Sequence, residues 1–483
     1  MSNRILLPNG LCFQLLSRQD LWLRSLKSFI QEIAEGVKQS KQLEIVVHEA
    51  AKKQPLASQY FNFHWYPVLN SYFLREEYLF PKSNPFKLLF CTDRNNKKKV
   101  LFGIRDESVL LQLSQLLSRG CWGTLTRQWV DDNLDSSFQA LLEQMINKDM
   151  IAETTSISPQ TSVQITPGIY RLQHASILYK TKTTGILIDP HFYSTYECHW
   201  MDSSDPNIRP IDLEGHIDAI LISHYHGDHF HLPTLMMMSR KIPIIVPKVP
   251  RATILCENMH QILCNLGFTN VIAVDWYSDP LVIGDIEVHI LPFYGEQPLL
   301  NEPPQHPDLR NWGNTYVLKT QDYTSWLLID SGKDSMGDMF EVASYVQRKF
   351  GSIDFLLSNL REFFIGTQQC NPFYITGQGE YWLSLSTEQI KRFPSMKEHC
   401  ITLGAEGVAK ICQILKVYHF LPYAHLWSSL GSFGQDELIL LAQLQQALKE
   451  QKGCETVIFP WKIGEGYSLV GAKKIFLNSI DIN

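Results

Sequence analysis

Ten cysteines are spread over the 483 residues, and no two of them form a C-x-x-C pair. A disulfide scaffold is therefore not expected in a chain of this length, and a zinc site built from cysteine pairs has no support. No run of about 18 apolar residues occurs, so we expect no bilayer-spanning helix. Lys and Arg number 43 against 49 Asp and Glu, and this net charge of −6 gives no basis for binding nucleic acid through bulk charge.

The composition that is present is that of a folded protein. Hydrophobic residues make up 45% of the chain and charged residues 19%, and the length allows two or three domains. The N-terminus has no long apolar segment followed by a small-residue cleavage site, so a signal peptide is not expected. These features predict a soluble, cytoplasmic protein with reduced cysteines.

A segment rich in Ser, Thr and Pro predicts a linker at residues 156–167. It separates an N-terminal domain, residues 1–155, from a second part, residues 168–483. The first part carries a small net positive charge and the second a negative one, so their surfaces should prefer different partners. We find no catalytic motif in the first part.

Hydrophobic periodicity predicts a smaller α+β domain followed by an α/β part. In the first part the expected helices are 21–37, 108–117 and 138–151, and the expected strands are 44–47, 86–91 and 99–104. In the second part the expected strands are 185–189, 219–223, 243–246, 271–275, 286–292, 315–320, 326–330 and 353–358. The expected helices there are 252–266, 339–350, 405–415 and 436–449. Early hairpins followed by alternating strands and helices indicate sheets that are covered by helices.

The densest group of metal-ligand side chains follows the apolar strand 219–223. The motif is H-x-H-x-D-H and consists of His224, His226, Asp228 and His229. Positions 224 and 226 of an extended backbone point the same way. We expect Gly227 to permit a sharp turn that returns the Asp and the last His to the same pocket. Two imidazoles can then hold one metal ion and the Asp–His pair a second, whereas four unrelated loop residues would rarely cluster so closely.

With this motif the chain resembles the metallo-β-lactamase superfamily, over about residues 165–465. The resemblance implies an αββα sandwich, preceded here by the smaller α+β domain, with two metals at one edge of the sandwich. It implies that Asp189 supports the ligands from behind and that Asp330 bridges the two metals. It also implies that His425 completes the second metal, with His419 and His399 as alternatives.

One ligand position departs from the hydrolases of that superfamily, which have a His at the end of the strand that lies between the H-x-H-x-D-H motif and the bridging Asp. Glu296 takes this position here. His289 lies inside the strand, where we expect it on a wall of the fold and not at the metals. The first metal would then be held by two His and one Glu, a ligand set typical of non-haem iron that activates oxygen.

The N-terminal domain, the H-x-H-x-D-H motif and Glu296 together resemble the CmlA-type diiron β-hydroxylases of chloramphenicol and nonribosomal-peptide biosynthesis. The resemblance implies a non-haem diiron monooxygenase that uses O2 and two external electrons. Its substrate would be an amino acid held as a thioester on an acyl or peptidyl carrier protein and hydroxylated at the β-carbon. The implied partners are that carrier and an electron donor such as a ferredoxin, and analogy allows a homodimer. Glu296 and Asp330 would be the carboxylates on which the chemistry depends.

Other functions stay open at this point. A dinuclear zinc or manganese hydrolase acting on an ester, thioester or phosphodiester explains the same ligands through a metal-bound hydroxide, but it must accept Glu296 in place of His. A degenerate binding subunit is disfavoured because the motif and Asp330 are intact. Oxidation at nitrogen, or at a carbon other than β, would use the same cluster.

Overall fold

The computed structural model describes most of the chain from residue 107 onward and shorter segments before it. The described residues are 4–8, 12–16, 32, 35–36, 39, 41–53, 63–66, 71–74, 87–91, 99–103, 107–147, 151–155, 164–192, 210–213, 215–253, 256–297, 308, 310–363, 384–386, 400–424, 435–470 and 474–479. Most of the predicted helix at 21–37 and of the predicted linker lies outside them.

The first large sheet has eight strands in the order β13-β12-β11-β10-β9-β8-β24-β25. Strands β10 to β13 are parallel, and the others pair antiparallel. Every residue of β10, β11 and β12 is buried, which explains their uninterrupted apolar sequences, because parallel strands are covered on both faces. The strands are β8 (Gly168–Arg171), β9 (Ile177–Lys180), β10 (Gly185–Ile188), β11 (Ala219–Leu221), β12 (Ile244–Pro247), β13 (Val271–Val274), β24 (Glu465–Val470) and β25 (Lys474–Ser479).

The second large sheet has seven strands in the order β14-β15-β16-β17-β20-β22-β23. It begins as an antiparallel meander and continues from β17 as parallel strands. The strands are β14 (Leu281–Ile283), β15 (Ile286–Pro292), β16 (Asn314–Lys319), β17 (Thr324–Ile329), β20 (Phe355–Ser358), β22 (His419–Pro422) and β23 (Val457–Ile458). A small hairpin, β18 (Lys333–Asp334) with β19 (Gly337–Asp338), lies after β17.

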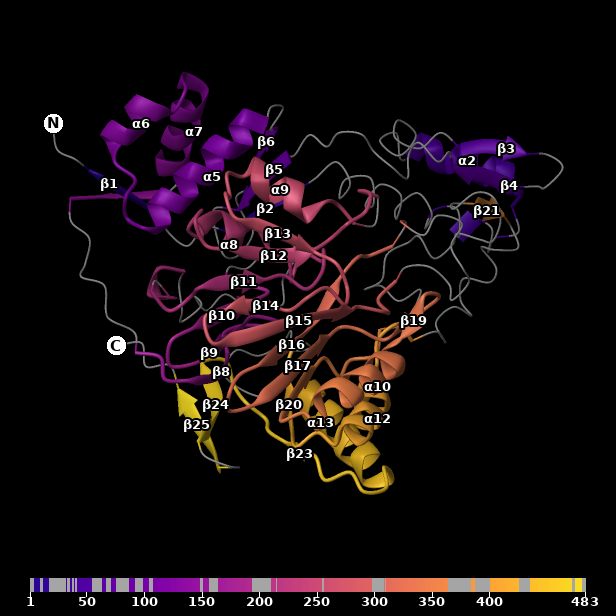
Figure 1. Cartoon of the computed structure of the whole chain (residues 1–483). Helices are drawn as coiled ribbons and strands as arrows, with labels where there is room; N and C mark the ends of the chain where they lie inside the picture. Colours follow the sequence, from indigo (N-terminus) through magenta and orange to yellow (C-terminus); the bar gives the residue numbers. More distant parts are fainter. Residues whose placement is uncertain are drawn as a thin grey trace.

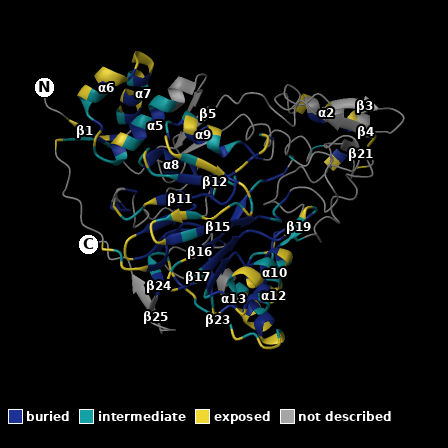
Figure 2. Cartoon of the chain, viewed as in Figure 1, coloured by how far each residue is buried: buried dark blue, intermediate teal, exposed yellow. Residues whose placement is uncertain are grey.

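The two sheets pack face to face, and helices cover the outer face of each (Figure 1). One buried cluster fills the space between the sheets, and two more lie between each sheet and its helices; Figure 2 shows these buried layers. The helices are α8 (Leu232–Met237) and α9 (Met259–Asn265) on one side, α10 (Met339–Phe350), α12 (Gly404–Leu415) and α13 (Gln435–Glu450) on the other, and a 3-10 turn η2 (Pro210–Leu213). This arrangement confirms the predicted αββα sandwich.

The described N-terminal elements form three groups. Strand β1 pairs with β7, helices α5 to α7 lie between these strands in sequence, and two small sheets have the orders β2-β5-β6 and β21-β4-β3. Strand β21 comes from the second part of the chain and pairs with β4. The elements are β1 (Ile5–Pro8), β2 (Cys12–Leu16), α2 (Leu43–Lys53), β3 (Phe63–Tyr66), β4 (Ser71–Leu74), β5 (Lys87–Cys91), β6 (Lys99–Gly103), α5 (Glu107–Cys121), α6 (Arg127–Asn133), α7 (Ser136–Asn147), β7 (Ile151–Thr154) and β21 (Ser384–Ser386).

Helix α5 packs on the sandwich, so that one buried cluster runs from α5 and α7 through α8 and α9 to the first sheet. Polar contacts accompany this packing. Trp122 Nε1 donates to the carbonyl of Met237 (2.9 Å), and Arg240 donates to the carbonyls of Ser114 (2.6 Å) and Met238 (2.8 Å). Arg240 therefore joins the end of α8 to α5.

The eight strands predicted in the second part are all present. Two other predictions, one strand and the start of one helix, are wrong. Residues 44–47 belong to helix α2 and not to a strand, because Val46 and Ala50 share one buried face at helical spacing. The helix predicted at 252–266 begins only at Met259, where the Asn258 side chain accepts a hydrogen bond from the backbone of Gln261 and caps it. No helix in the described part of the chain has the length and apolarity of a membrane span.

Replacement of Arg240 by Met should lower the free energy of unfolding by about 2–4 kcal/mol, because hydrogen bonds to a charged group contribute about 1.5–3 kcal/mol and their loss leaves carbonyl groups unpaired. Chemical denaturation measures the change. The matched control is Arg119→Met, since Arg119 is exposed and lies over the ring of Trp129. Equal effects of the two substitutions would contradict the role given to Arg240.

Candidate metal centre

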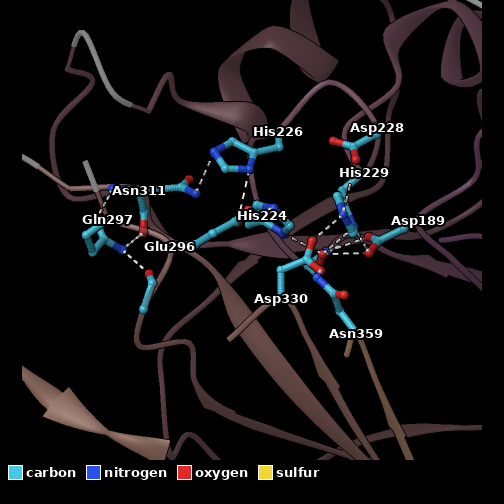
Figure 3. Close-up of polar contacts among 12 residues, drawn as sticks. Asp189, His224, His226, Asp228, His229, Glu296, Gln297, Asn311, Asp330 and Asn359 are labelled. Carbon is cyan, nitrogen blue, oxygen red and sulfur yellow. Dashed lines mark hydrogen bonds and ion pairs between the residues drawn. The ribbon is translucent and has the colours of Figure 1, made fainter. Parts of the chain in front are cut away.

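The predicted ligands come together at one edge of the sandwich, where strands of both sheets end (Figure 3). Asp189 follows β10, the H-x-H-x-D-H motif follows β11, Glu296 follows β15 and Asp330 follows β17. The carboxyl ends of parallel strands meet at the same edge of a sheet, and this brings residues that are far apart in sequence into one site.

His224, His226 and Glu296 form the first of three groups that could each hold a metal ion. Glu296 Oε2 lies 3.1 Å from His224 Nε2 and 3.0 Å from His226 Nδ1. The His224 side chain is fully buried and that of Glu296 is 10% exposed, whereas 40% of the His226 side chain reaches solvent. His226 is therefore the most exposed member of this group.

His224, His229 and Asp330 form the second group. His229 Nε2 lies 2.8 Å from Asp330 Oδ2, and the other oxygen of Asp330 accepts a hydrogen bond from Asn359 Nδ2 (2.7 Å). All three members are buried. Because His224 belongs to both groups, the two candidate metal positions are adjacent, as a dinuclear centre requires.

Asp189 lies behind these ligands. One of its oxygens accepts from the backbone N–H of Ser223 (2.7 Å), and the other accepts from the Ser223 hydroxyl (2.6 Å) and lies 2.8 Å from His229 Nδ1. A proton held at Nδ1 leaves the lone pair of Nε2 directed into the site. This is the supporting position that the sequence resemblance implies for Asp189.

His174 completes a third group with Asp228 and His229, and the sequence analysis missed it. It lies in the loop between β8 and β9 and is 3% exposed, and its Nε2 is 3.0 Å from Asp228 Oδ2. Asp228 Oδ2 in turn lies 3.8 Å from His229 Nε2. A single His between two strands carries no motif, so only the fold reveals that it faces the ligands.

The backbone around Glu296 is held in an unusual conformation. Gly295 has φ +88° and Glu296 has φ +49°. A Cβ atom on Gly295 would lie 2.4 Å from the backbone N of Gly332 and 2.5 Å from the carbonyl O of Ile401, so only glycine fits. The backbone N–H of Glu296 donates to that same carbonyl of Ile401 (2.7 Å), which fixes where the carboxylate begins.

A buried ion pair supports the same loop. Arg310 donates to Asp334 (2.8 Å) and to the carbonyl of Phe293 (3.0 Å), and Asp334 also accepts from the backbone N–H of Gly295 (3.1 Å). The guanidinium lies near the rings of two tryptophans, 5.2 Å from the Trp276 centroid and 5.1 Å from that of Trp312. The loop that carries Glu296 is thus fixed by contacts on both of its sides.

Backbone strain gathers at this edge of the sandwich. Among the described residues, six that are not glycine have positive φ, and four of them lie at the site: Asp189 (44°), Glu296 (49°), Ile329 (62°) and Ala424 (62°). Such conformations cost about 1–3 kcal/mol each and persist at functional sites where the surroundings enforce them. Ile329 directly precedes Asp330, and Ala424 directly precedes His425.

The charges in the site attract a cation. Burial by itself lowers the pKa of His229, but the carboxylates of Asp228, Asp330 and Asp189 outweigh it and raise this pKa well above its ordinary value. Burial by itself raises the pKa of Asp228, but His229 and His174 outweigh it and hold the pKa well below its ordinary value. Negative charge therefore predominates around His229, and a metal ion would offset it.

The ligand atoms themselves fit a metal. His224 Nε2, His229 Nε2 and Glu296 Oε2 are buried, and each of them lies within about 3 Å of another candidate ligand atom. Burial, followed by the neighbouring His229 and His226, lowers the pKa of His224 well below its ordinary value, so its imidazole is neutral, the form that binds metals. Imidazole nitrogens and carboxylate oxygens without sulfur suit iron, zinc or manganese.

The remaining predicted residues have different outcomes. His425 and His399 lie outside the described residues. His419 is wrong as an alternative ligand, because it begins β22 at the end opposite to the site and its Nδ1 lies 3.0 Å from the carbonyl O of Asp354. His289 is on a wall as expected, 3.3 Å from Glu287 and packed against the ring of Phe350.

Gly227 does not act as predicted. Its φ is not positive, and a Cβ atom there would meet nothing within 4 Å. The turn is made by ordinary hydrogen bonds, from the backbone N–H groups of His229 (3.0 Å) and Phe230 (2.7 Å) to the carbonyl of His226. The turn that returns His229 to the site therefore does not depend on glycine.

Comparisons with known proteins agree with this fold. Residues 184–359 match the model of the beta-lactamase superfamily domain, and this segment contains every described ligand candidate except His174. The crystal structure of CmlA, a diiron β-hydroxylase from Streptomyces venezuelae, is similar over 96% of this chain and 99% of that one, with a TM-score of 0.54 and 15% identity. A variant of that enzyme is similar with a TM-score of 0.50 and 16% identity, over 94% and 98%.

A curated relative from Streptomyces venezuelae is 32% identical over 154 residues, 32% of this chain and 28% of the relative. It is named 4-amino-L-phenylalanyl-(CmlP-peptidyl-carrier-protein) 3-hydroxylase. The matched stretch thus spans less than a third of that protein. Residues 184–359 therefore match a beta-lactamase superfamily domain, and the chain shares the fold of the CmlA structure over 96% of its length.

Two glycines beside the motif should respond differently to alanine. Gly227→Ala should leave the thermal stability and metal content unchanged, because its side chain would meet open space. Gly313→Ala should destabilise the protein by about 1–3 kcal/mol, the usual range for overpacking, because its Cβ would lie 2.8 Å from the ring of Phe293 and 2.9 Å from His224 Cβ. Thermal unfolding and elemental analysis distinguish the two, and a damaging Gly227→Ala would restore the predicted role of that glycine.

Proposed function

We propose that this protein is a non-haem diiron monooxygenase that hydroxylates an amino acid bound as a thioester to a carrier protein. The reaction would consume O2 and two electrons from an external donor such as a ferredoxin. We place the new hydroxyl group at the β-carbon.

The position of Glu296 carries this proposal. Its Oε2 faces the Nε2 of His224 at 3.1 Å and the Nδ1 of His226 at 3.0 Å, and these three atoms form one candidate metal position. Two imidazoles and one carboxylate are a ligand set of oxygen-activating iron enzymes. Zinc has no redox chemistry, so replacing His by a carboxylate at this position would not give a zinc hydrolase any oxidative activity.

The candidate ligand side chains would hold the two metals, and their carboxylates would offset the positive charge of the metals. His224, His226 and Glu296 would hold the first iron. Asp228 and His229, with Asp330 shared between the metals and His425 completing the set, would hold the second. When bound, a pair of iron ions supplies the capacity to activate O2 for insertion of one oxygen atom into a C–H bond. Asp189 and Asn359 keep their ligands in place through the hydrogen bonds described above.

The substrate should approach from the side of His226, the most exposed ligand of the first metal position. The relative's name, with its amino acid on a peptidyl carrier protein, supports a carrier-bound substrate for this chain. A carrier delivers its substrate on a flexible arm, so it needs an opening and not a deep closed pocket. The net positive charge of residues 1–160 offers a weak attraction for an acidic carrier domain.

The metal content of protein expressed with both iron and zinc supplied tests the proposal. We expect two irons per chain by elemental analysis, and O2 consumption with formation of a hydroxylated product when reductant and an aminoacyl carrier protein are added. Mass spectrometry of the carrier detects the added oxygen. Two zincs per chain, with no oxidation after reconstitution with iron, would instead favour a hydrolase.

Glu296→His should shift the metal preference from iron towards zinc and reduce oxygenation at least 10-fold, because it replaces a hard anionic ligand by a neutral imidazole. The same exchange at Glu287, whose side chain is 44% exposed on β15, is the control for adding a histidine nearby. Metal ratios by elemental analysis and product yield per iron give the answer. Unchanged oxygenation in Glu296→His would show that this residue is not a ligand.

A further inference from the structure

We infer that Asn311 is a positioning residue for His226, and that its carbonyl oxygen Oδ1 accepts a hydrogen bond from His226 Nε2 when the first metal position is filled. The inference rests on the proposed first position, formed by His224, His226 and Glu296. It adds a residue outside the motif to the determinants of metal binding.

The two ring nitrogens of His226 have different contacts. Nδ1 faces Glu296 Oε2 at 3.0 Å, and Nε2 faces Asn311 Nδ2 at 3.1 Å (Figure 3). Asn311 is 1% exposed, and its Oδ1 is buried without a hydrogen bond in the described part of the chain. In this arrangement the amide N–H donates to Nε2, so the proton of a neutral ring is at Nδ1 and faces the carboxylate.

A metal at the first position reverses these roles. It needs the lone pair of Nδ1, and a neutral imidazole then carries its proton at Nε2. An amide NH2 group cannot accept that proton, whereas the amide oxygen can. A half-turn of the amide about its Cβ–Cγ bond exchanges the two atoms and gives Oδ1 the hydrogen bond that it lacks.

The surroundings hold Asn311 so that only the amide has to turn. Its backbone N–H donates to Gln297 Oε1 (2.7 Å), and Gln297 Nε2 donates back to the carbonyl of Asn311 (2.9 Å) and to that of Gly295 (2.9 Å). Gln297 directly follows Glu296. The carboxylate ligand and the partner of the imidazole ligand are therefore linked by two hydrogen bonds, and the amide stays aligned with His226.

The role predicts opposite effects for two substitutions. Asn311→Asp keeps the shape and offers oxygen only, so it should bind the first metal at least as tightly as the wild type. Asn311→Leu removes both polar atoms and should weaken that metal about 10–100-fold, the usual effect of losing a group that orients a ligand. Asn270→Asp, an exposed residue, controls for the added negative charge.

The test titrates Co²⁺ into the full-length protein and each variant. The ligand-field absorption of Co²⁺ reports binding, and competition with a chelator gives the dissociation constants. Glu296→Gln identifies the part of the signal that belongs to the first position. Near-ultraviolet circular dichroism of each variant before titration shows that the fold is intact.

The outcomes separate the inference from the function it rests on. If Asn311→Asp loses affinity as Asn311→Leu does, the amide donates through Nδ2 in the bound state and the inference is overturned. Unchanged affinity in Asn311→Leu overturns it too. If the wild type shows no Co²⁺ signal that depends on Glu296, the proposed first metal position is wrong, whatever Asn311 does.

Discussion

The placing of four carboxylates, two buried and two mostly buried, among imidazoles is the constraint on which the site depends. A buried carboxylate that lacks a partner costs several kcal/mol, so each one needs a dedicated contact. Asp189 receives two hydrogen bonds from Ser223, Asp330 receives one from Asn359, and Asp228 lies against His174. Among the described residues, the Oε2 atom of Glu296 is faced by the imidazole nitrogens of His224 and His226, which are themselves candidate ligands. A metal ion bound between them would balance the charge of Glu296.

The two-sheet architecture explains how these contacts arise together. Strands β10 and β11 of the first sheet and β17 and β20 of the second end at the same edge, so a residue placed just after any of them enters the site. The strained residues Asp189 and Ile329 lie at two of these strand ends, where the chain must turn a side chain away from the sheet. Packing between the sheets supplies the stability that offsets this strain.

A part of the site can be predicted from the sequence when the residues that mark it lie close together in the chain. The motif at 224–229 is visible within six residues after an apolar strand, whereas the carboxylates after β15 and β17 were predicted by resemblance to a known family, and their roles as ligands stay predictions. His174 and Asn311 were missed because their roles exist only in three dimensions. The prediction for residues 44–47 failed for the opposite reason: a window of four residues reads Val46 and Val47 as a strand, and only the longer helical spacing to Ala50 corrects it.

The two candidate metal positions are built from different parts of the fold, and this bears on which of them can accept a different ligand residue. The second position takes Asp330 from the end of a central strand, and its His229 is held by Asp189 at the end of another. The first position takes His224 and His226 from the motif after β11, but its Glu296 lies in the loop segment 293–297. This segment contacts the segment 310–314 through Arg310 and Gln297. A loop can accept a different ligand residue without disturbing the sheets. Position 296 therefore lies in the half of the centre where a different ligand residue would leave the sheets undisturbed.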